Sequence, residues 1–305
     1  MNWGIALRGT EIACSVITAS GQLVEQCSLP IESENSYDHL LGQIDKLVGI
    51  VSGRVGEKPD LLGVGTHGTV DSSTGVLNNC NTQSLNFKPL GSDISKVLGV
   101  PVIVANDANC FTLAECHHGI VAAEAPWAKT VYGIILGTTI RASHVVNCQT
   151  EEGRSFRGVE LGHSVLEPDG DACYCGKNGC VETLISSTAL QSFYMRKSGR
   201  KLSFAEIYKQ YQSGRDILAD ETIERLIKYF GLTLSNVINT VDPDVIVLGG
   251  SIANIPLLYD QGVSEVYRNV FNSNRPTPIL KAGLGSSFSG SGAAYLGNFR
   301  SEYHF

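Results

Sequence analysis

Three short apolar segments separated by turn residues open the chain. They cover Trp3–Leu7, Glu11–Thr18 and Leu23–Leu29, and the residues between them include Gly9 and Gly21. Glycine tolerates the backbone conformations of tight turns, so this spacing favours strands that fold back on each other. The pattern predicts an antiparallel meander at the start of the protein.

The apolar spacing then changes from strand-like to helical. Between about residues 37 and 53, one helical face is formed by Leu40, Leu41, Ile44, Leu47, Val48 and Val51. Strands are predicted at Leu61–Gly65 and Pro101–Val104, and a helix from Ala108 to His117 follows the second of them. Alternating strands and helices indicate an α/β fold.

A second strand and helix set fills the rest of the chain. Strands are predicted at Val131–Leu136, Ala142–Val146 and Val245–Leu248, and helices at Ser187–Ser198, Ser203–Ser213, Ile217–Asn239 and Gly290–Leu296. No Pro/Ser-rich linker separates two halves, so the boundary follows from the pattern alone. We expect an N-terminal lobe of residues 1–118 and a larger lobe of 119–289, with the C-terminal helix in 290–305 crossing back to the first lobe.

Charge and hydropathy exclude several classes of partner. The 305 residues carry 23 Lys and Arg against 30 Asp and Glu, a net charge of −7, so we expect no nucleic-acid binding. No uninterrupted apolar stretch approaches the roughly 18–20 residues of a membrane helix, and the first residues lack a signal-peptide pattern. We therefore expect a soluble, cytoplasmic protein that does not bind membranes.

Three of the nine cysteines lie within eight residues of each other. They are Cys173, Cys175 and Cys180, and His163 precedes them by ten residues. Three thiolates and one imidazole form the ligand set of a closed, structural zinc site, in which no position is left open to water. The alternative is a loop with three free thiols.

Two further polar groups suggest a carbohydrate site. Asn106 and Asp107 stand where a predicted strand meets a helix, a common ligand position in α/β proteins, although an Asp there could equally cap the helix. Glu160 and Glu182 flank the proposed zinc ligands, so a metal-ordered loop would hold both carboxylates. Carboxylates with an Asn can bind sugar hydroxyls, and one Asp can act as a general base.

These motifs resemble the signature of the ROK family of sugar kinases and repressors. The resemblance rests on Gly158–His163, Cys173–Thr183 and Asn106–Cys110, with weaker likeness at Asp71–Gly75, at Asn81 and at Asp242–Asp244 with Gly249 and Gly250. The chain looks most like bacterial fructokinases and N-acetylglucosamine kinases. The resemblance implies an actin-like, hexokinase-type (ribonuclease H-like) fold of two α/β lobes with an interdomain cleft, and a homodimer.

The same resemblance implies roles for individual residues. Asp107 would take the proton from the sugar hydroxyl that attacks the γ-phosphoryl group of ATP. The remaining sugar hydroxyls would be held by Asn106, Glu160, His163 and Glu182, with His163 also a zinc ligand. Gly68 would pass its backbone close to the sugar. The family has Pro before that Gly, whereas this chain has His67, so the wall of the site would differ there.

The nucleotide-facing positions implied by the resemblance are Gly9, Thr10, Gly137, Thr138, Gly249 and Gly250. The family pattern Asp-x-Gly-Gly-Thr-Lys is replaced here by Ala6–Glu11, which lacks the carboxylate that serves Mg²⁺. The pattern Gly-Thr-Gly-x-Gly-x-Gly is replaced by Gly137–Ser143, with Thr139 and Arg141 at glycine positions. We expect these loops to adopt another shape. Arg8 and Arg141 either face phosphates or are solvated.

Three functions compete on these observations. The first is an ATP-dependent sugar kinase acting on a hexose or N-acetylhexosamine, with Zn²⁺ as a structural cofactor and ATP with Mg²⁺ as the phosphoryl source. The second is a protein that binds sugar and zinc but uses ATP poorly or not at all. The third is a repressor, which is disfavoured because the first strand begins at Trp3 without a helix-turn-helix before it and the charge is acidic.

Overall fold

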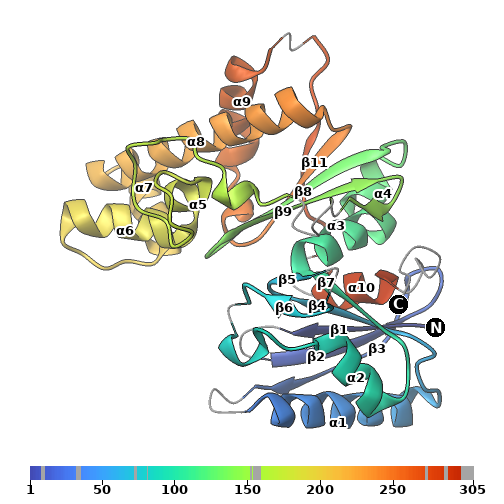
Figure 1. Cartoon of the computed structure of the whole chain (residues 1–305). Helices are drawn as coiled ribbons and strands as arrows, with labels where there is room; N and C mark the ends of the chain where they lie inside the picture. Colours follow the sequence, from blue (N-terminus) through green and yellow to red (C-terminus); the bar gives the residue numbers. More distant parts are fainter. Residues whose placement is uncertain are drawn as a thin grey trace. The chain divides into compact units, whose positions relative to one another are not determined.

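The computed structural model describes the chain apart from residues 8–10, 32–35, 72–73, 81, 152, 154–158, 272–273, 285–287 and 297–305, and apart from the side chains of 288–291. The chain divides into two compact units (Figure 1). Unit 1 comprises residues 1–127, 144–158 and 283–305, and unit 2 comprises 128–143 and 159–282. The sequence analysis expected lobes of 1–118 with 290–305, and of 119–289.

Unit 1 is built on a five-stranded sheet with the strand order β3-β2-β1-β4-β7. The strands are β1 (Asn2–Leu7), β2 (Glu11–Ile17), β3 (Leu23–Pro30), β4 (Leu62–Thr66) and β7 (Val102–Asn106). Neighbours β1, β2 and β3 pair antiparallel, which confirms the predicted meander, whereas β4 pairs parallel with both β1 and β7. The parallel strands β1, β4 and β7 therefore have their carboxyl ends at one edge of this sheet.

Helices cover both faces of this sheet (Figure 1). They are α1 (Tyr37–Val55), α2 (Leu90–Leu98), α3 (Asp107–His118) and α10 (Phe288–Tyr295), and the short helix α4 (Ile120–Glu124) packs against α3. The apolar stripe predicted for α1 is buried, and Ser36 and Gly56 cap its two ends. A small hairpin of β5 (Thr69–Val70) and β6 (Leu77–Asn78) follows β4.

Helix α10 belongs to unit 1 although it comes from the end of the chain. It packs against α3 and β1, and glycines permit the close approach. A Cβ at Gly63 would lie 1.7 Å from the carbonyl oxygen of Ala293, and one at Gly292 would lie 1.9 Å from that of Cys110. These glycines let the last helix pack closely against β4 and α3.

Unit 2 contains the parallel strands β8 (Thr130–Leu136), β11 (Val245–Gly249) and β12 (Ile279–Lys281). Strand β9 (Ile140–Val146) follows β8 after a three-residue turn, and the chain passes from unit 2 to unit 1 within β9. Its last residues pair with β10 (Gln149–Thr150). The sequence prediction that β9 begins at Ala142 was wrong by two residues, because Ile140 is already buried strand.

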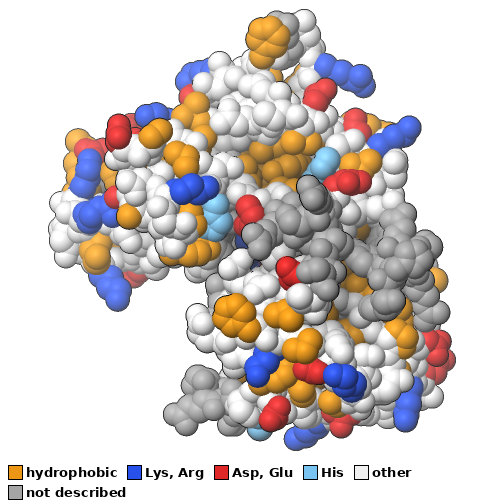
Figure 2. All heavy atoms as spheres, viewed as in Figure 1, with side chains coloured by type: hydrophobic (Ala, Val, Ile, Leu, Met, Phe, Trp, Pro, Cys, Tyr) orange, Lys and Arg blue, Asp and Glu red, His pale blue; other side chains and the backbone are white. Residues whose placement is uncertain are grey.

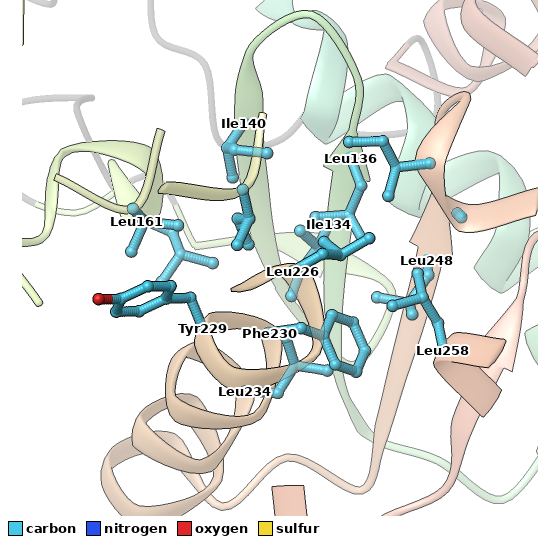
Figure 3. Packing of buried hydrophobic residues seen from close by; sticks show 14 of the residues in the cluster. Ile134, Leu136, Ile140, Leu161, Leu226, Tyr229, Phe230, Leu234, Leu248 and Leu258 are labelled. Carbon is cyan, nitrogen blue, oxygen red and sulfur yellow. The ribbon is translucent and has the colours of Figure 1, made fainter. Parts of the chain in front are cut away.

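The core of unit 2 forms where α8 (Ile217–Val241) packs on this sheet (Figure 3). Leu226, Phe230 and Leu234 of α8 lie against Ile134 and Leu248 of the strands. The remaining helices are α5 (Val181–Ile185), α6 (Ser187–Ser198), α7 (Phe204–Ser213) and α9 (Val263–Asn269). Asp242 ends α8 with a φ of 50°, and Pro243 follows, as the sequence predicted.

The predicted strands and helices are confirmed, and their ends differ from the observed ones by at most two residues. The helices α2, α4, α5 and α9 and the strands β5, β6, β10 and β12 were not predicted, and each of them is short. Among the described residues, no helix is long and apolar enough to span a bilayer. Figure 2 shows acidic and basic side chains interspersed over the described surface in view.

Candidate functional site

The ends of strands β4 and β7 hold the first group of site residues, in unit 1. Thr66 of β4 pairs with Asn106 of β7, so the residues that follow each strand start from adjacent positions. The Asn106 side chain caps α3 by accepting a hydrogen bond from the Ala108 N–H at 2.9 Å. Its amide nitrogen donates to the Gly68 carbonyl at 2.9 Å, so Asn106 ties the two strand ends together.

Gly68 must be glycine for two reasons. Its φ is +94°, a conformation that side chains rarely adopt, and a Cβ would lie 2.5 Å from the Asn78 carbonyl oxygen. The neighbouring backbone of Cys80 is fixed in turn by Asn86, whose side chain bonds the Cys80 N–H and carbonyl, each at 2.8 Å. The predicted backbone position of Gly68 therefore lies in a rigid turn beside Asn106.

Asp107 is the first residue of α3, and its side chain is 15% exposed. The positive end of the helix dipole favours a carboxylate at this place. Oδ2 of Asp107 lies 3.1 Å from Nδ1 of His67, which follows β4. The sequence analysis noted His67 only as a change in the wall. The signal that was missed is the position of His67 directly after β4. Because β4 pairs with β7, the residue after β4 lies beside the start of α3.

The four predicted metal ligands converge in unit 2. The donor atoms of His163, Cys173, Cys175 and Cys180 all lie within 4.8 Å of one another. Nδ1 of His163 is 3.5 Å from the Cys173 sulfur, and the sulfurs of Cys175 and Cys180 are 3.6 Å apart. A tetrahedron with Zn–S bonds of about 2.3 Å has edges of about 3.8 Å, so the donor set fits a four-coordinate zinc ion.

Local backbone structure explains why these residues meet. His163 ends the short 3-10 helix η2 (Leu161–His163), and Cys180 is the residue before α5. Between the cysteines, Gly176 and Gly179 have φ values of +88° and +64° and turn the chain back.

The thiols differ in acidity. Burial raises the pKa of Cys180 to about 12, whereas the backbone N–H of Lys177 is the main cause of a lowered pKa at Cys175. A buried thiol must lose its proton to bind a metal, so metal uptake at Cys180 releases a proton. A zinc ion held by all four residues would order the loop and supply no open coordination position for chemistry.

The predicted carboxylates of unit 2 lie near this loop. Glu182 is in the first turn of α5, and its Oε2 accepts a hydrogen bond from the Ile140 N–H at 3.1 Å. Burial raises the pKa of Glu182, with a further contribution from the charge of Glu160, whereas the Ile140 N–H, His163 and Arg141 oppose the shift. Glu160, His163 and Glu182 are thus close enough for their charges to interact.

The second nitrogen of His163 is directed toward Tyr174. Nε2 lies 2.9 Å from the Tyr174 hydroxyl, and the two rings are edge to face at 5.0 Å. The Tyr174 side chain is exposed. The sequence analysis did not select Tyr174, although it lies between two metal-ligating cysteines.

The positions that the sequence analysis predicted to face the nucleotide are described in part. Gly9 and Thr10 lie outside the described residues. Gly137 and Thr138 form the turn after β8, where their carbonyls accept hydrogen bonds from Ser187 N–H at 2.8 Å and the Thr188 hydroxyl at 3.0 Å. All residues from 137 to 143 are described, and none has a positive φ. Residues 140–143 belong to β9, so the turn is shorter than the seven-residue sequence pattern.

Gly249 and Gly250 end the neighbouring strand β11. Gly249 pairs with Ile135 of β8, so both strand ends lie at one sheet edge. Gly250 has a φ of +90°, and a Cβ there would lie 2.3 Å from the Leu136 carbonyl oxygen. The position therefore requires glycine. In contrast, Ala6 is buried in β1 and has no side-chain oxygen, so it does not supply the carboxylate that serves Mg²⁺ in the family pattern.

Comparison with known proteins agrees with these observations. The ROK family model matches residues 2–299. An N-acetyl-D-glucosamine kinase of Escherichia coli is 30% identical over 97% of this chain and 99% of its own length. The crystal structure of a ROK hexokinase from Thermus thermophilus has a TM-score of 0.89 at 28% identity, covering 98% of this chain and 99% of that one.

A ROK family glucokinase from Streptomyces griseus, crystallised with glucose and AMPPNP, has a TM-score of 0.78 at 23% identity, covering 97% of this chain and 98% of that one. The α/β fold is thus the actin-like fold of ROK hexokinases, as the sequence analysis expected. Nearly the whole chain matches both in sequence and in structure. The chain belongs to the ROK family.

Proposed function

We propose that the protein is an ATP-dependent sugar kinase that phosphorylates a hydroxyl of a hexose or N-acetylhexosamine. The observation that carries this proposal is the fixed carboxylate of Asp107 at the start of α3, beside the rigid turn of Gly68. Family membership and an N-acetyl-D-glucosamine kinase relative at 30% identity support it. The reaction would take place in the cytoplasm, where ATP is available.

Asp107 has the chemistry of a general base. When the sugar hydroxyl attacks the γ-phosphorus, an O–P bond forms, the bond to the ADP oxygen breaks, and the hydroxyl proton passes to the Asp107 carboxylate. Asn106 and the Gly68 backbone would bind neighbouring sugar hydroxyls in unit 1. In unit 2, Glu160, His163 and Glu182 would bind the others, as the family resemblance implies.

The zinc site supports the sugar site through Glu182. Cys180 immediately precedes α5, and Glu182 lies in the first turn of that helix. A metal that holds Cys180 would therefore fix the start of α5 and the direction of the Glu182 side chain. Gly137, Thr138, Gly249 and Gly250 would face the nucleotide, together with Gly9 and Thr10, and we expect the homodimer that the resemblance implies.

A second function is favoured by specific observations in the nucleotide half. Ala6 is a buried apolar residue, and the turn from 137 to 139 uses two of its carbonyls to bind the start of α6. A cradle of backbone N–H groups for phosphate requires a different arrangement. These features would suit a protein that binds sugar and zinc, and transfers phosphate slowly or not at all.

An ADP-release assay separates the two functions. Purified protein is mixed with ATP, Mg²⁺ and each of glucose, fructose, N-acetylglucosamine and N-acetylmannosamine. The kinase proposal expects turnover with at least one sugar, and a loss of about 10²–10⁴-fold in kcat for Asp107→Asn. Asp45→Asn, on an exposed position of α1, is the control and should keep full activity. Sugar-dependent thermal stabilisation without any turnover would instead support the binding protein.

A further inference from the structure

We propose that His67 is a positioning residue for the general base. Its imidazole donates the Nδ1 hydrogen to Oδ2 of Asp107, which fixes the rotation of the carboxylate that receives the proton of the sugar hydroxyl. The contact is the 3.1 Å separation of Nδ1 and Oδ2. This inference rests on the proposed kinase function and adds to it a residue that is absent from the family pattern.

Both ends of the contact are held by the sheet. His67 stands between Thr66, which is 1% exposed at the end of β4, and Gly68, whose carbonyl is bound by Asn106. Asp107 directly follows Asn106 at the end of β7, the strand that pairs with β4. The register of two adjacent strands therefore sets the distance between the two side chains, which is unlike a surface pair on long flexible side chains.

Partial burial strengthens the contact. The side chains of His67 and Asp107 are 24% and 15% exposed, so water competes less for the hydrogen bond than at a fully exposed pair. An ionised carboxylate is only an acceptor, so Nδ1 must carry the hydrogen when the two groups bond. This fixes the neutral imidazole in the Nδ1–H tautomer.

A fixed carboxylate is a better general base than one that rotates. The terminal torsion of Asp is broad, so an unrestrained carboxylate presents its oxygens over a range of directions. Proton transfer requires one oxygen within about 2.6–3.2 Å of the hydroxyl, and a loss of orientation lowers the rate. The proline of the family pattern has no N–H and cannot supply this bond.

Kinetics of three variants test the proposal. His67→Ala and His67→Pro should lower kcat by about 10–100-fold, with the sugar KM changed less than about threefold, because the lost bond acts on the base. His67→Asn should keep at least a third of wild-type kcat, since its side-chain amide can donate from the place of Nδ1. His39→Ala, on the exposed surface of α1, is the matched control.

Three kinetic outcomes would overturn the inference, two of them in single variants. One is a wild-type kcat in His67→Ala. The other is an equal loss in His67→Asn and His67→Ala, which would mean that His67 only shapes the wall. In the Asp107→Asn background, removal of His67 should cause no further loss, because the positioned base is already gone. A full additional loss would likewise contradict the proposal.

A measurement without turnover distinguishes this inference from the proposed function. In spectra of protein labelled with ¹⁵N-histidine, the His67 signals are identified by their absence in His67→Asn. At pH 8 they should report a proton on Nδ1, and this signal should change in Asp107→Ala. If no sugar is phosphorylated but the Nδ1–H tautomer is present, the kinase proposal fails and the pairing stands. An Nε2–H tautomer in the wild type would overturn the pairing itself.

Discussion

Replacement of Glu115 should destabilise unit 1 more than any exposed acidic substitution. Glu115 is fully buried on α3, the helix that begins with Asp107. Its Oε2 accepts hydrogen bonds from the N–H groups of Ile120 at 2.8 Å and Gly283 at 3.1 Å, and Oε1 accepts one from Leu284 at 3.1 Å. The carboxylate therefore joins α3 to the segment by which the chain re-enters unit 1.

The magnitude follows from these three bonds. A hydrogen bond to a charged group contributes about 1.5–3 kcal/mol, with values at the low end where the donor is partly hydrated, as it is at exposed Gly283. With each of the three bonds near the low end of this range, Glu115→Ala should lower the free energy of unfolding by about 4–6 kcal/mol. Glu115→Gln keeps an oxygen for two donors but directs an amide N–H toward a third, so it should cost about 1.5–3 kcal/mol.

Urea unfolding followed by fluorescence measures both changes, with Glu124→Ala on the exposed side of α4 as the control. The expected order of stability is wild type and control, then Glu115→Gln, then Glu115→Ala. At a chain length of 305 residues, the alanine variant should also lose roughly 5–10 °C in Tm. An alanine variant within about 0.5 kcal/mol of wild type would refute the reasoning.

Three other substitutions or conditions have defined outcomes. Zinc should copurify at one ion per chain. Cys175→Ser should lower the metal content measured by mass spectrometry, whereas the control Cys148→Ser should not. A wild-type protein that purifies without metal would contradict the zinc site. Gly250→Ala should lower the free energy of unfolding by about 1–3 kcal/mol, because φ is +90° and a Cβ would lie 2.3 Å from the Leu136 carbonyl oxygen. The control Gly42→Ala, in α1, has open space and should not destabilise the protein. Equal effects of the two variants in urea unfolding would contradict this prediction. Burial lowers the pKa of His117 below 6.5, so the unfolded chain binds a proton at a higher pH than the folded chain does, and stability should fall as the pH drops below about 6.5. His117→Gln should therefore flatten the dependence of Tm on pH between about 7.5 and 5.5. An unchanged slope would exclude His117 as the cause.

The sequence alone determined the local structure and the sets of reactive residues. Apolar alternation and helical spacing placed most strands and helices within two residues of their observed ends, because periodicity is a property of consecutive residues. The sequence also predicted the cysteine cluster, because three of its ligands lie within one short segment that contains Gly176 and Gly179. Asn106 and Asp107 were selected because a strand ends there and a helix begins.

Only the tertiary structure decided which distant groups meet. The contact of His67 with Asp107 depends on the register between β4 and β7, and no spacing along the chain encodes that register. The bond from the Ile140 N–H to Glu182 and the three bonds at Glu115 likewise join segments far apart in sequence. A sequence specifies the donors and acceptors at each position, but their pairing follows from how the sheet and helices pack, because a hydrogen bond forms only over about 3 Å.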